Sequence, residues 1–199
     1  QDGQINIRRD VGKLARLQNL VSEQPLSGNI GIGHTRWATH GEPNERNAHP
    51  HMGATGEVVI VHNGIVENYI SLREQLLSAG VTLKSDTDSE VIVHLVEQYM
   101  AAGYPFKDAV GHTIGELQGA SAMVLISTQE PDRIIAARVG NAGGIAIGIG
   151  DDEMFVASDM PAILDHTRRM AFLEPGCMAV VSQNDFSIQT LSGESVSPE

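Results

Sequence analysis

The hydrophobic pattern of this chain changes from helical spacing to short strands at Gly119, and this change limits the folds that it can adopt. Before Gly119, apolar residues recur at helical spacing within 71–79, 88–102 and 106–117. After it, turn residues separate short apolar runs at 122–127, 134–139, 145–149, 154–157, 178–182 and 186–191. One block of helices beside many short strands predicts a layered α+β fold with antiparallel sheets.

The first third of the chain is less regular. We expect a helix over 11–21, a strand over 29–35, a long ordered loop over 36–56 and a buried strand over 57–62. The glycine-rich stretches 140–144 and 148–152 indicate hairpin-like breaks between strands. We expect one domain over residues 1–191. Residues 192–199 are polar and featureless, which is typical of a tail or the start of a linker.

Composition excludes several function classes. The formal net charge of −12 argues against nonspecific nucleic-acid binding and against docking on an anionic membrane. No apolar run approaches the roughly 18 residues of a membrane-spanning helix, and the polar first residues do not resemble a secretory signal. A single cysteine rules out an internal disulfide and fits a reducing compartment. We therefore expect a cytoplasmic protein without nucleic-acid or membrane partners.

Residues 34–41 read H-T-R-W-A-T-H-G and place an arginine and the only tryptophan at the end of an expected strand. The guanidinium of Arg36 is planar and always charged, so it can bind a carboxylate through two parallel hydrogen bonds. We interpret Arg36 as a candidate ligand for an acidic substrate group. Trp37 has two interpretations, packing in the core and contact with a substrate.

Asn63 and Gly64 directly follow the expected strand 57–62. This dipeptide is most often a plain turn. It can also form an oxyanion hole, in which the asparagine side-chain amide and the glycine backbone N–H donate to one oxygen. The dipeptide alone does not decide between these roles.

Asp86 and Asp88 lie at the start of the helix expected over 88–102, where Thr87 and Glu90 match the S/T-x-x-E capping box. Acidic residues at a helix start bind backbone N–H groups and offset the helix dipole. A carboxylate in this position is also well placed to receive a substrate ammonium group. Both roles stay open for Asp88 on the residues alone.

Histidines cluster between residues 34 and 62. They are His34, His40, His49, His51 and His62. A metal site is one interpretation, but the sequence lacks H-E-x-x-H, paired cysteines and a carboxylate at familiar ligand spacing. We therefore expect no metal and interpret these histidines as packing and hydrogen-bonding residues. Cys177 follows a Pro-Gly turn at a strand start, which predicts a small buried thiol.

Several motifs together resemble one family. They are H-T-R-W-A-T-H-G (34–41), N-A-H-P-H (47–51), V-H-N-G-I-V-E-N (61–68), S-D-T-D-S-E-V-I (85–92), V-A-S-D (156–159), T-R-R (167–169) and L-E-P-G (173–176). In this order and spacing they resemble the glutaminase domain of glutamine–fructose-6-phosphate aminotransferases. That domain is a class II glutamine amidotransferase of the N-terminal-nucleophile family. The resemblance implies a four-layer αββα sandwich of two antiparallel sheets, incomplete here at its N-terminus.

The resemblance also implies roles for single residues. In the family, glutamine is held by an arginine and an aspartate that match Arg36 and Asp88. A threonine and a histidine that match Thr39 and His40 lie nearby. The tryptophan that matches Trp37 is associated with closing the site.

The residues that match Asn63 and Gly64 form the family's oxyanion hole, and no cofactor is implied. The nucleophile in the family is a cysteine at the mature N-terminus, whose own α-amino group acts as the base. Because this chain begins with Gln1, we expect that segment to be absent, and residues 1–199 alone to be inactive.

The family connects this domain to a sugar-isomerising region, which we expect to be absent here, and the full-length enzyme is expected to form a homodimer. The resemblance implies that the parent enzyme uses ammonia from glutamine to make glucosamine 6-phosphate from fructose 6-phosphate. The alternative is a catalytically dead domain that binds glutamine or mediates association.

Overall fold

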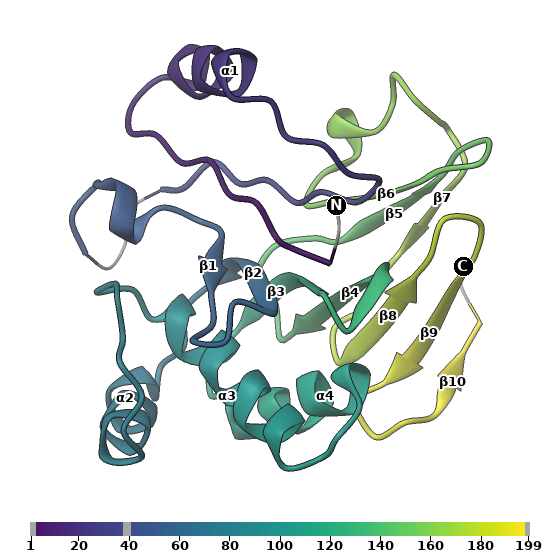
Figure 1. The fold of residues 1–199 in the computed structure, drawn as a ribbon. Coiled ribbons are helices and arrows are strands. Elements are labelled where there is room, and N and C mark those ends of the chain that lie inside the picture. The colour runs from purple at the N-terminus through teal and green to yellow at the C-terminus, as the bar shows by residue number, and fades with distance from the viewer. Residues whose placement is uncertain (1–2, 38–40, 198–199) are drawn as a thin grey trace.

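A computed structural model describes residues 3–37 and 41–197. Two antiparallel sheets lie at its centre, with α2, α3 and α4 below them and α1 above them in the view of Figure 1. The helices are α1 (Leu14–Glu23), α2 (Tyr69–Ser78), α3 (Ser89–Ala101) and α4 (Phe106–Glu116), with short 3-10 helices η1 (Glu45–Asn47) and η2 (Met160–Ala162). The predicted α+β class with two antiparallel sheets is confirmed.

The larger sheet has seven strands in the order β1-β2-β3-β4-β8-β9-β10, and every neighbouring pair is antiparallel. Its strands are β1 (His51–Met52), β2 (Val58–Gly64), β3 (Ser121–Ser127), β4 (Glu130–Val139), β8 (Cys177–Val181), β9 (Phe186–Thr190) and β10 (Ser195–Val196). The smaller sheet has the order β6-β5-β7, with β5 (Ala146–Ile149), β6 (Met154–Ala157) and β7 (Met170–Phe172).

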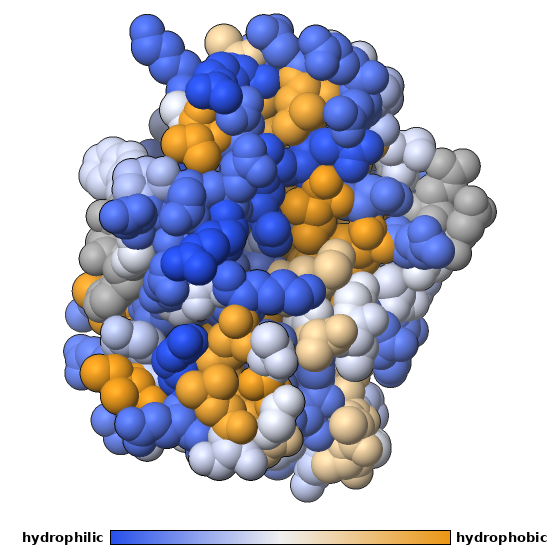
Figure 2. Space-filling view, turned by 60° about the vertical axis from the view of Figure 1, so that its left-hand side comes forward, coloured by the Kyte–Doolittle hydropathy of each residue, from blue (hydrophilic) through white to orange (hydrophobic). Residues whose placement is uncertain are grey.

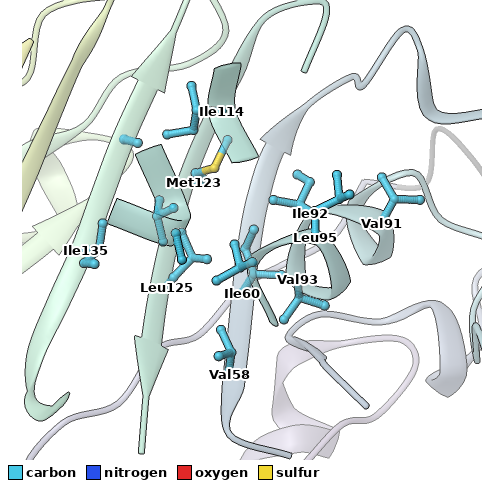
Figure 3. Close-up of a cluster of buried hydrophobic side chains, with 14 of the residues drawn as sticks. Val58, Ile60, Val91, Ile92, Val93, Leu95, Ile114, Met123, Leu125 and Ile135 are labelled. Atoms are coloured by element: carbon cyan, nitrogen blue, oxygen red, sulfur yellow. The ribbon is translucent and has the colours of Figure 1, made fainter. Parts of the chain in front are cut away.

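The alternation of side chains along each central strand divides the interior into two cores. On β3, Met123 and Leu125 point toward the helices, whereas Ala122 and Val124 point toward the smaller sheet. Figure 3 shows the first core, in which β2, β3 and β4 residues meet Ile92 and its neighbours on α3. Fully burying one such side chain contributes about 1.5–3 kcal/mol.

The second core lies between the two sheets. Ile147 of β5 and Leu173 pack there against Ala179 and Val181 of β8. Ile147 and Leu173 are fully buried. This core fixes the smaller sheet against the larger one, on the face opposite α3 and α4.

Helix α1 forms close to the predicted range, but none of its residues is buried. Leu14 is 63% exposed, so the apolar face predicted over 11–21 does not enter the core. Figure 2 shows hydrophobic atoms among hydrophilic ones at the top of the molecule, where α1 lies. The helix therefore forms without the burial that usually stabilises a helix of this length.

The predicted strand over 29–35 is wrong. Its exposure alternates residue by residue, as in a strand, yet it forms no ladder with any described strand. A strand is defined by backbone hydrogen bonds to a neighbour, and the alternating sequence cannot supply that neighbour.

Three short strands were not predicted. They are β1, β7 and β10, each of two or three residues. The predicted loop over 36–56 contains η1 and β1, and the stretch expected to be featureless contains β10, which pairs with β9. The break at 148–152 lies in the β5–β6 hairpin, as predicted, but 140–144 connects strands of different sheets.

Candidate active site

Strand β2 ends with Asn63 and Gly64, opposite Ala122 and Ser121 of β3. Gly64 has a backbone φ of +137°, which residues with a Cβ rarely adopt. A Cβ built on it would lie 2.2 Å from the carbonyl oxygen of Ala120, so two backbone segments approach closely here. Only glycine fits this position. The side chain of Asn63 is exposed at the sheet end.

His34 contacts Asn63 from the extended segment 29–35. Its Nε2 lies 2.8 Å from Oδ1 of Asn63. Burial lowers the pKa of His34 below its usual value, and the charge of Arg36 acts in the same direction, whereas the hydrogen bond with Asn63 opposes it. The imidazole is therefore neutral near pH 7. The resemblance and the spacing of the motif had not singled out His34 as a site residue.

His62, directly before Asn63, joins three elements. Its Nδ1 lies 2.9 Å from Oγ of Ser89 on α3, and its Nε2 lies 3.0 Å from Oγ of Ser121 on β3. Burial lowers its pKa to about 4, although the charge of Asp88 acts in the opposite direction. This buried, neutral side chain fixes the end of β2 against the start of α3.

Asp88 directly precedes α3, but its carboxylate does not cap that helix. Its Oδ2 accepts a hydrogen bond of 2.9 Å from the backbone N–H of Val66, and the residue is only 4% exposed. Asp88 therefore ties α3 to the segment that follows Gly64. Ser89 Oγ lies 3.5 Å from the other carboxylate oxygen, Oδ1.

The predicted capping box at Thr87–Glu90 does not form. Glu90 instead accepts hydrogen bonds from the backbone N–H groups of Lys84 (2.7 Å) and Ser85 (2.6 Å). Burial acts to raise the pKa of Glu90, but hydrogen bonds from His94, Ser85 and the Lys84 N–H outweigh it and lower that pKa to about 2. The Thr87 N–H that the box requires donates instead to Oγ of Ser85 (3.3 Å).

Arg36 lies at the start of a loop that packs against the Asp86 segment. Its guanidinium donates to the carbonyl oxygens of Gly41 (3.2 Å) and Glu42 (3.4 Å). The fully buried Asn47 donates to Glu42 (3.0 Å) and accepts from the backbone N–H of Asp86 (2.9 Å). The two segments predicted to bind opposite ends of a substrate are thus joined through Asn47.

Trp37 is 91% exposed, so the interpretation that it packs in the core is wrong. An exposed indole is available for contact with a ligand or another part of the protein. Thr39 and His40, the other two predicted binding residues in this loop, lie outside the described residues.

A cavity of about 420 Å³ lies beside the end of β2. Its walls include His34, His62 and Asn63, together with residues 154–158 of the smaller sheet. Neither Arg36 nor Asp88 lines this cavity. The structure therefore brings Asn63 and His34 to one hollow, while the predicted arginine–aspartate pair lies outside its wall.

Two further histidines of the cluster, His49 and His51, pack beside one another, and His49 also packs beside His34. The ring centroid of His49 lies 4.2 Å from that of His34 and 4.7 Å from that of His51. Burial lowers the pKa of His49 to about 2 and that of His51 to about 4. His51 Nε2 lies 3.0 Å from Oγ1 of Thr87. Within residues 3–37 and 41–197, no group of three or more histidines, cysteines or carboxylates could hold a metal ion.

Cys177 begins β8 and is buried in the core between the sheets. The prediction of a small buried thiol is confirmed. Cys177 does not line the cavity beside Asn63 described above.

Comparison with known families identifies the kind of domain. The family described as a glutamine amidotransferase domain matches residues 22–190. This chain belongs to that family. The match includes the loop with Arg36, the end of β2 and the start of α3, so each of the segments described above lies within it.

Similar sequences come from larger enzymes. The chain is 45% identical over 190 residues to the glutamine–fructose-6-phosphate aminotransferase (isomerizing) of Pyrococcus horikoshii, covering 96% of this chain and 31% of that protein. It is 45% identical over 198 residues to the enzyme of the same name from Shewanella oneidensis, covering 100% and 32%. The chain thus spans about a third of the length of the curated relatives it matches.

Solved structures support the fold. Glutamine phosphoribosylpyrophosphate amidotransferase from B. subtilis aligns with a TM-score of 0.67 at 24% identity, covering 79% of this chain and 34% of that one. A structure described as the allosteric regulatory enzyme of purine biosynthesis aligns with a TM-score of 0.68 at 25% identity, with the same coverage. The predicted N-terminal-nucleophile sandwich is confirmed. No helix in the described part of the chain is long and apolar enough to cross a membrane.

Proposed function

We propose that this chain is the glutaminase part of a larger enzyme, which releases ammonia from glutamine and uses it to convert fructose 6-phosphate into glucosamine 6-phosphate. The observation that carries the proposal is the end of β2, where Gly64 is held in a conformation reserved for glycine and Asn63 is exposed beside a cavity. The similarity to glutamine–fructose-6-phosphate aminotransferases supports the acceptor. The cytoplasmic location and the homodimer remain predictions.

The chemistry needs a stabilised oxyanion. When a thiolate attacks the side-chain carbonyl carbon of glutamine, the carbonyl oxygen becomes negatively charged. The Asn63 amide and the Gly64 backbone N–H would donate to that oxygen. Donors fixed before the reaction stabilise this charge without reorganising. One such donor lowers the activation barrier by about 2.7–4 kcal/mol.

Substrate binding would use the two segments joined by Asn47. We propose that Arg36 binds the α-carboxylate of glutamine and Asp88 its ammonium group, with Thr39 and His40 nearby. Because Val66 N–H occupies Oδ2 of Asp88, the ammonium would bind at Oδ1. Both ends of an amino acid are then held by opposite charges, while Trp37 is exposed and available to close over the substrate.

The nucleophile is not Cys177. The family resemblance implies a cysteine at the mature N-terminus, with its own α-amino group as the base. The only thiol within the 199 residues is buried between the sheets. That burial favours a second candidate function for residues 1–199 by themselves. In this function the domain binds glutamine or mediates association, and it does not hydrolyse glutamine.

Replacing Asn63 in the full-length protein tests the glutaminase proposal. Asn63→Ala should lower kcat for glutamine hydrolysis by about 10²–10³-fold and leave KM for glutamine nearly unchanged. Asn184→Ala, in the exposed turn between β8 and β9, is the matched control and should keep parental turnover. Parental activity in Asn63→Ala would contradict the proposed oxyanion role. Formation of glucosamine 6-phosphate from fructose 6-phosphate tests the acceptor.

Residues 1–199 alone test whether the nucleophile lies among them. We expect this polypeptide to release no ammonia from glutamine. Calorimetry should detect glutamine binding that Arg36→Ala abolishes. Ammonia release by residues 1–199 would show that a group within them acts as the nucleophile.

A further inference from the structure

Asn63 can support an oxyanion only in one of its two amide orientations. The NH₂ group must face the reacting oxygen, because the amide oxygen would repel a negative charge. The two orientations have nearly the same shape, so packing alone hardly distinguishes them. A neighbouring group that can hydrogen-bond to only one end of the amide can select one orientation.

His34 is positioned to select the orientation of the Asn63 amide. Its Nε2 lies 2.8 Å from Oδ1 of Asn63, and both residues line the same cavity. His34 comes from the extended segment before the Arg36 loop, 29 residues earlier in the chain than Asn63. Because this partner is on a separate segment, the amide orientation does not depend on β2 alone.

The tautomer of the neutral His34 ring can be inferred from the surroundings of Nδ1, the ring nitrogen that does not contact Asn63. Within residues 3–37 and 41–197, Nδ1 is buried and has no hydrogen-bond partner. A proton on Nδ1 would leave a buried donor unsatisfied and would turn a lone pair of Nε2 toward the oxygen of Asn63. A proton on Nε2 is donated to that oxygen, which removes the lone-pair repulsion, and it leaves Nδ1 as a buried acceptor rather than a buried donor. Burial and the charge of Arg36 both disfavour a second proton on the ring.

We propose that His34 is a positioning residue: its Nε2–H holds the Asn63 amide oxygen, so that the Asn63 NH₂ group faces the reacting carbonyl. The inference rests on the proposed glutaminase function. His34 itself touches neither the substrate nor the oxyanion. It acts through Asn63 and so affects the turnover step rather than the binding of glutamine.

Three variants of the full-length protein test this role. His34→Leu removes the donor and should lower kcat for glutamine hydrolysis at least about tenfold, with KM for glutamine nearly unchanged. His34→Gln places an amide N–H near the position of Nε2 and should restore most of kcat. Adding His34→Leu to Asn63→Ala should cause no further loss, because the residue that His34 orients is gone.

Several results would overturn the inference while leaving the glutaminase function in place. They are parental kcat in His34→Leu, no rescue by His34→Gln in a folded variant, or full additivity of His34→Leu with Asn63→Ala. Far-UV circular dichroism and thermal unfolding of each variant identify any that fail to fold. An inactive parental enzyme would instead contradict the proposed function.

A measurement on the parental protein needs no turnover. Solid-state NMR of full-length protein labelled with ¹⁵N-histidine reports which ring nitrogen of His34 carries the proton. Comparison with His34→Gln assigns the signal. A protonated Nε2 with a bare Nδ1 is expected. A bare Nε2 would overturn the inference, because the ring could not then donate to Asn63.

Discussion

Gly64 shows how one residue without a side chain can fix a functional site. Its φ of +137° and the Ala120 carbonyl 2.2 Å from a built Cβ leave no room for alanine. The close approach continues in the next residue, where Ile65 N–H donates to the same carbonyl at 3.2 Å. The Asn63 side chain is thus presented from a backbone held on both sides of Gly64.

Gly64→Ala is therefore expected to destabilise the protein by about 2–4 kcal/mol, from backbone strain and overpacking together. Gly111→Ala is the matched control. Gly111 lies inside α4 with nothing within 4 Å of a built Cβ, so alanine there should stabilise by about 0.5–1 kcal/mol. Urea unfolding followed by circular dichroism measures both. Equal effects of the two substitutions would contradict the strain argument.

The buried histidines make stability depend on pH. Burial lowers the pKa of His51 and His62 to about 4. An unfolded histidine titrates near pH 6.5, so the unfolded state binds more protons between these values. The free energy of unfolding should therefore fall as pH drops from about 6.5 toward 4, by up to about 1.4 kcal/mol per pH unit for each histidine.

Urea unfolding at pH values from about 7.5 to about 4.5 checks this dependence. His51→Gln should reduce the slope, whereas His166→Gln, at an exposed position, should leave it as in the parental protein. Glu90 affects the free energy of unfolding in a lower pH range. Its pKa near 2 means that its contribution is complete above about 4.5 and is lost below it. A stability that is constant between pH 7 and 5 would contradict the burial of neutral histidines.

At the scale of elements, α3 is the helix that organises the site. Its start carries Ser89, which contacts His62, and its far end carries Glu97. The Glu97 carboxylate accepts hydrogen bonds from the backbone N–H groups of Ala54 (2.6 Å) and Thr55 (3.2 Å). Thr55 Oγ1 donates to it at 2.5 Å. The helix therefore holds the turn between β1 and β2 as well as the end of β2.

Glu97→Ala should destabilise the protein by about 1.5–3 kcal/mol, because part-buried backbone donors lose a charged acceptor. Glu97→Gln keeps one acceptor oxygen and should cost less. Glu74→Ala, on the exposed face of α2, should change stability by less than about 0.5 kcal/mol. Chemical denaturation compares the three variants. A loss from Glu97→Ala no larger than that from Glu74→Ala would show that the 53–55 turn does not depend on α3.

At the scale of the whole molecule, two cores share the seven-stranded sheet. The central strands β3 and β4 contribute side chains to both cores, so neither core can form without them. We therefore expect residues 1–191 to unfold as one cooperative unit. Hydrogen exchange of α3 and of β5 should then report the same opening free energy.

Substitutions in each core test this cooperativity. Ile92→Ala, in the helix-side core, and Ile147→Ala, between the sheets, should each cost about 2–5 kcal/mol and shift one common transition. Ile70→Ala is the matched control, because Ile70 is 60% exposed, and it should change stability by less than about 0.5 kcal/mol. Two separate transitions after Ile147→Ala would indicate two independent units.

The sequence alone predicted the elements whose signal is local. Apolar spacing placed α3 and α4 to within a residue or two, and short apolar runs placed seven strands of the two sheets. It also predicted the family, because the residues around Arg36 and Asn63 form contiguous motifs. Hydrophobic periodicity and motif order are properties of neighbours in the chain, so they can be read without a fold.

Tertiary structure decided what depends on residues far apart in the sequence. Residues 29–35 have the alternation of a strand but no partner, whereas the two-residue β10 is a strand because β9 lies beside it. Glu90 caps a turn rather than its own helix, because the chain folds back in front of α3. His34 meets Asn63 across 29 residues. A hydrogen bond needs both partners in place, and only the folded chain brings them together.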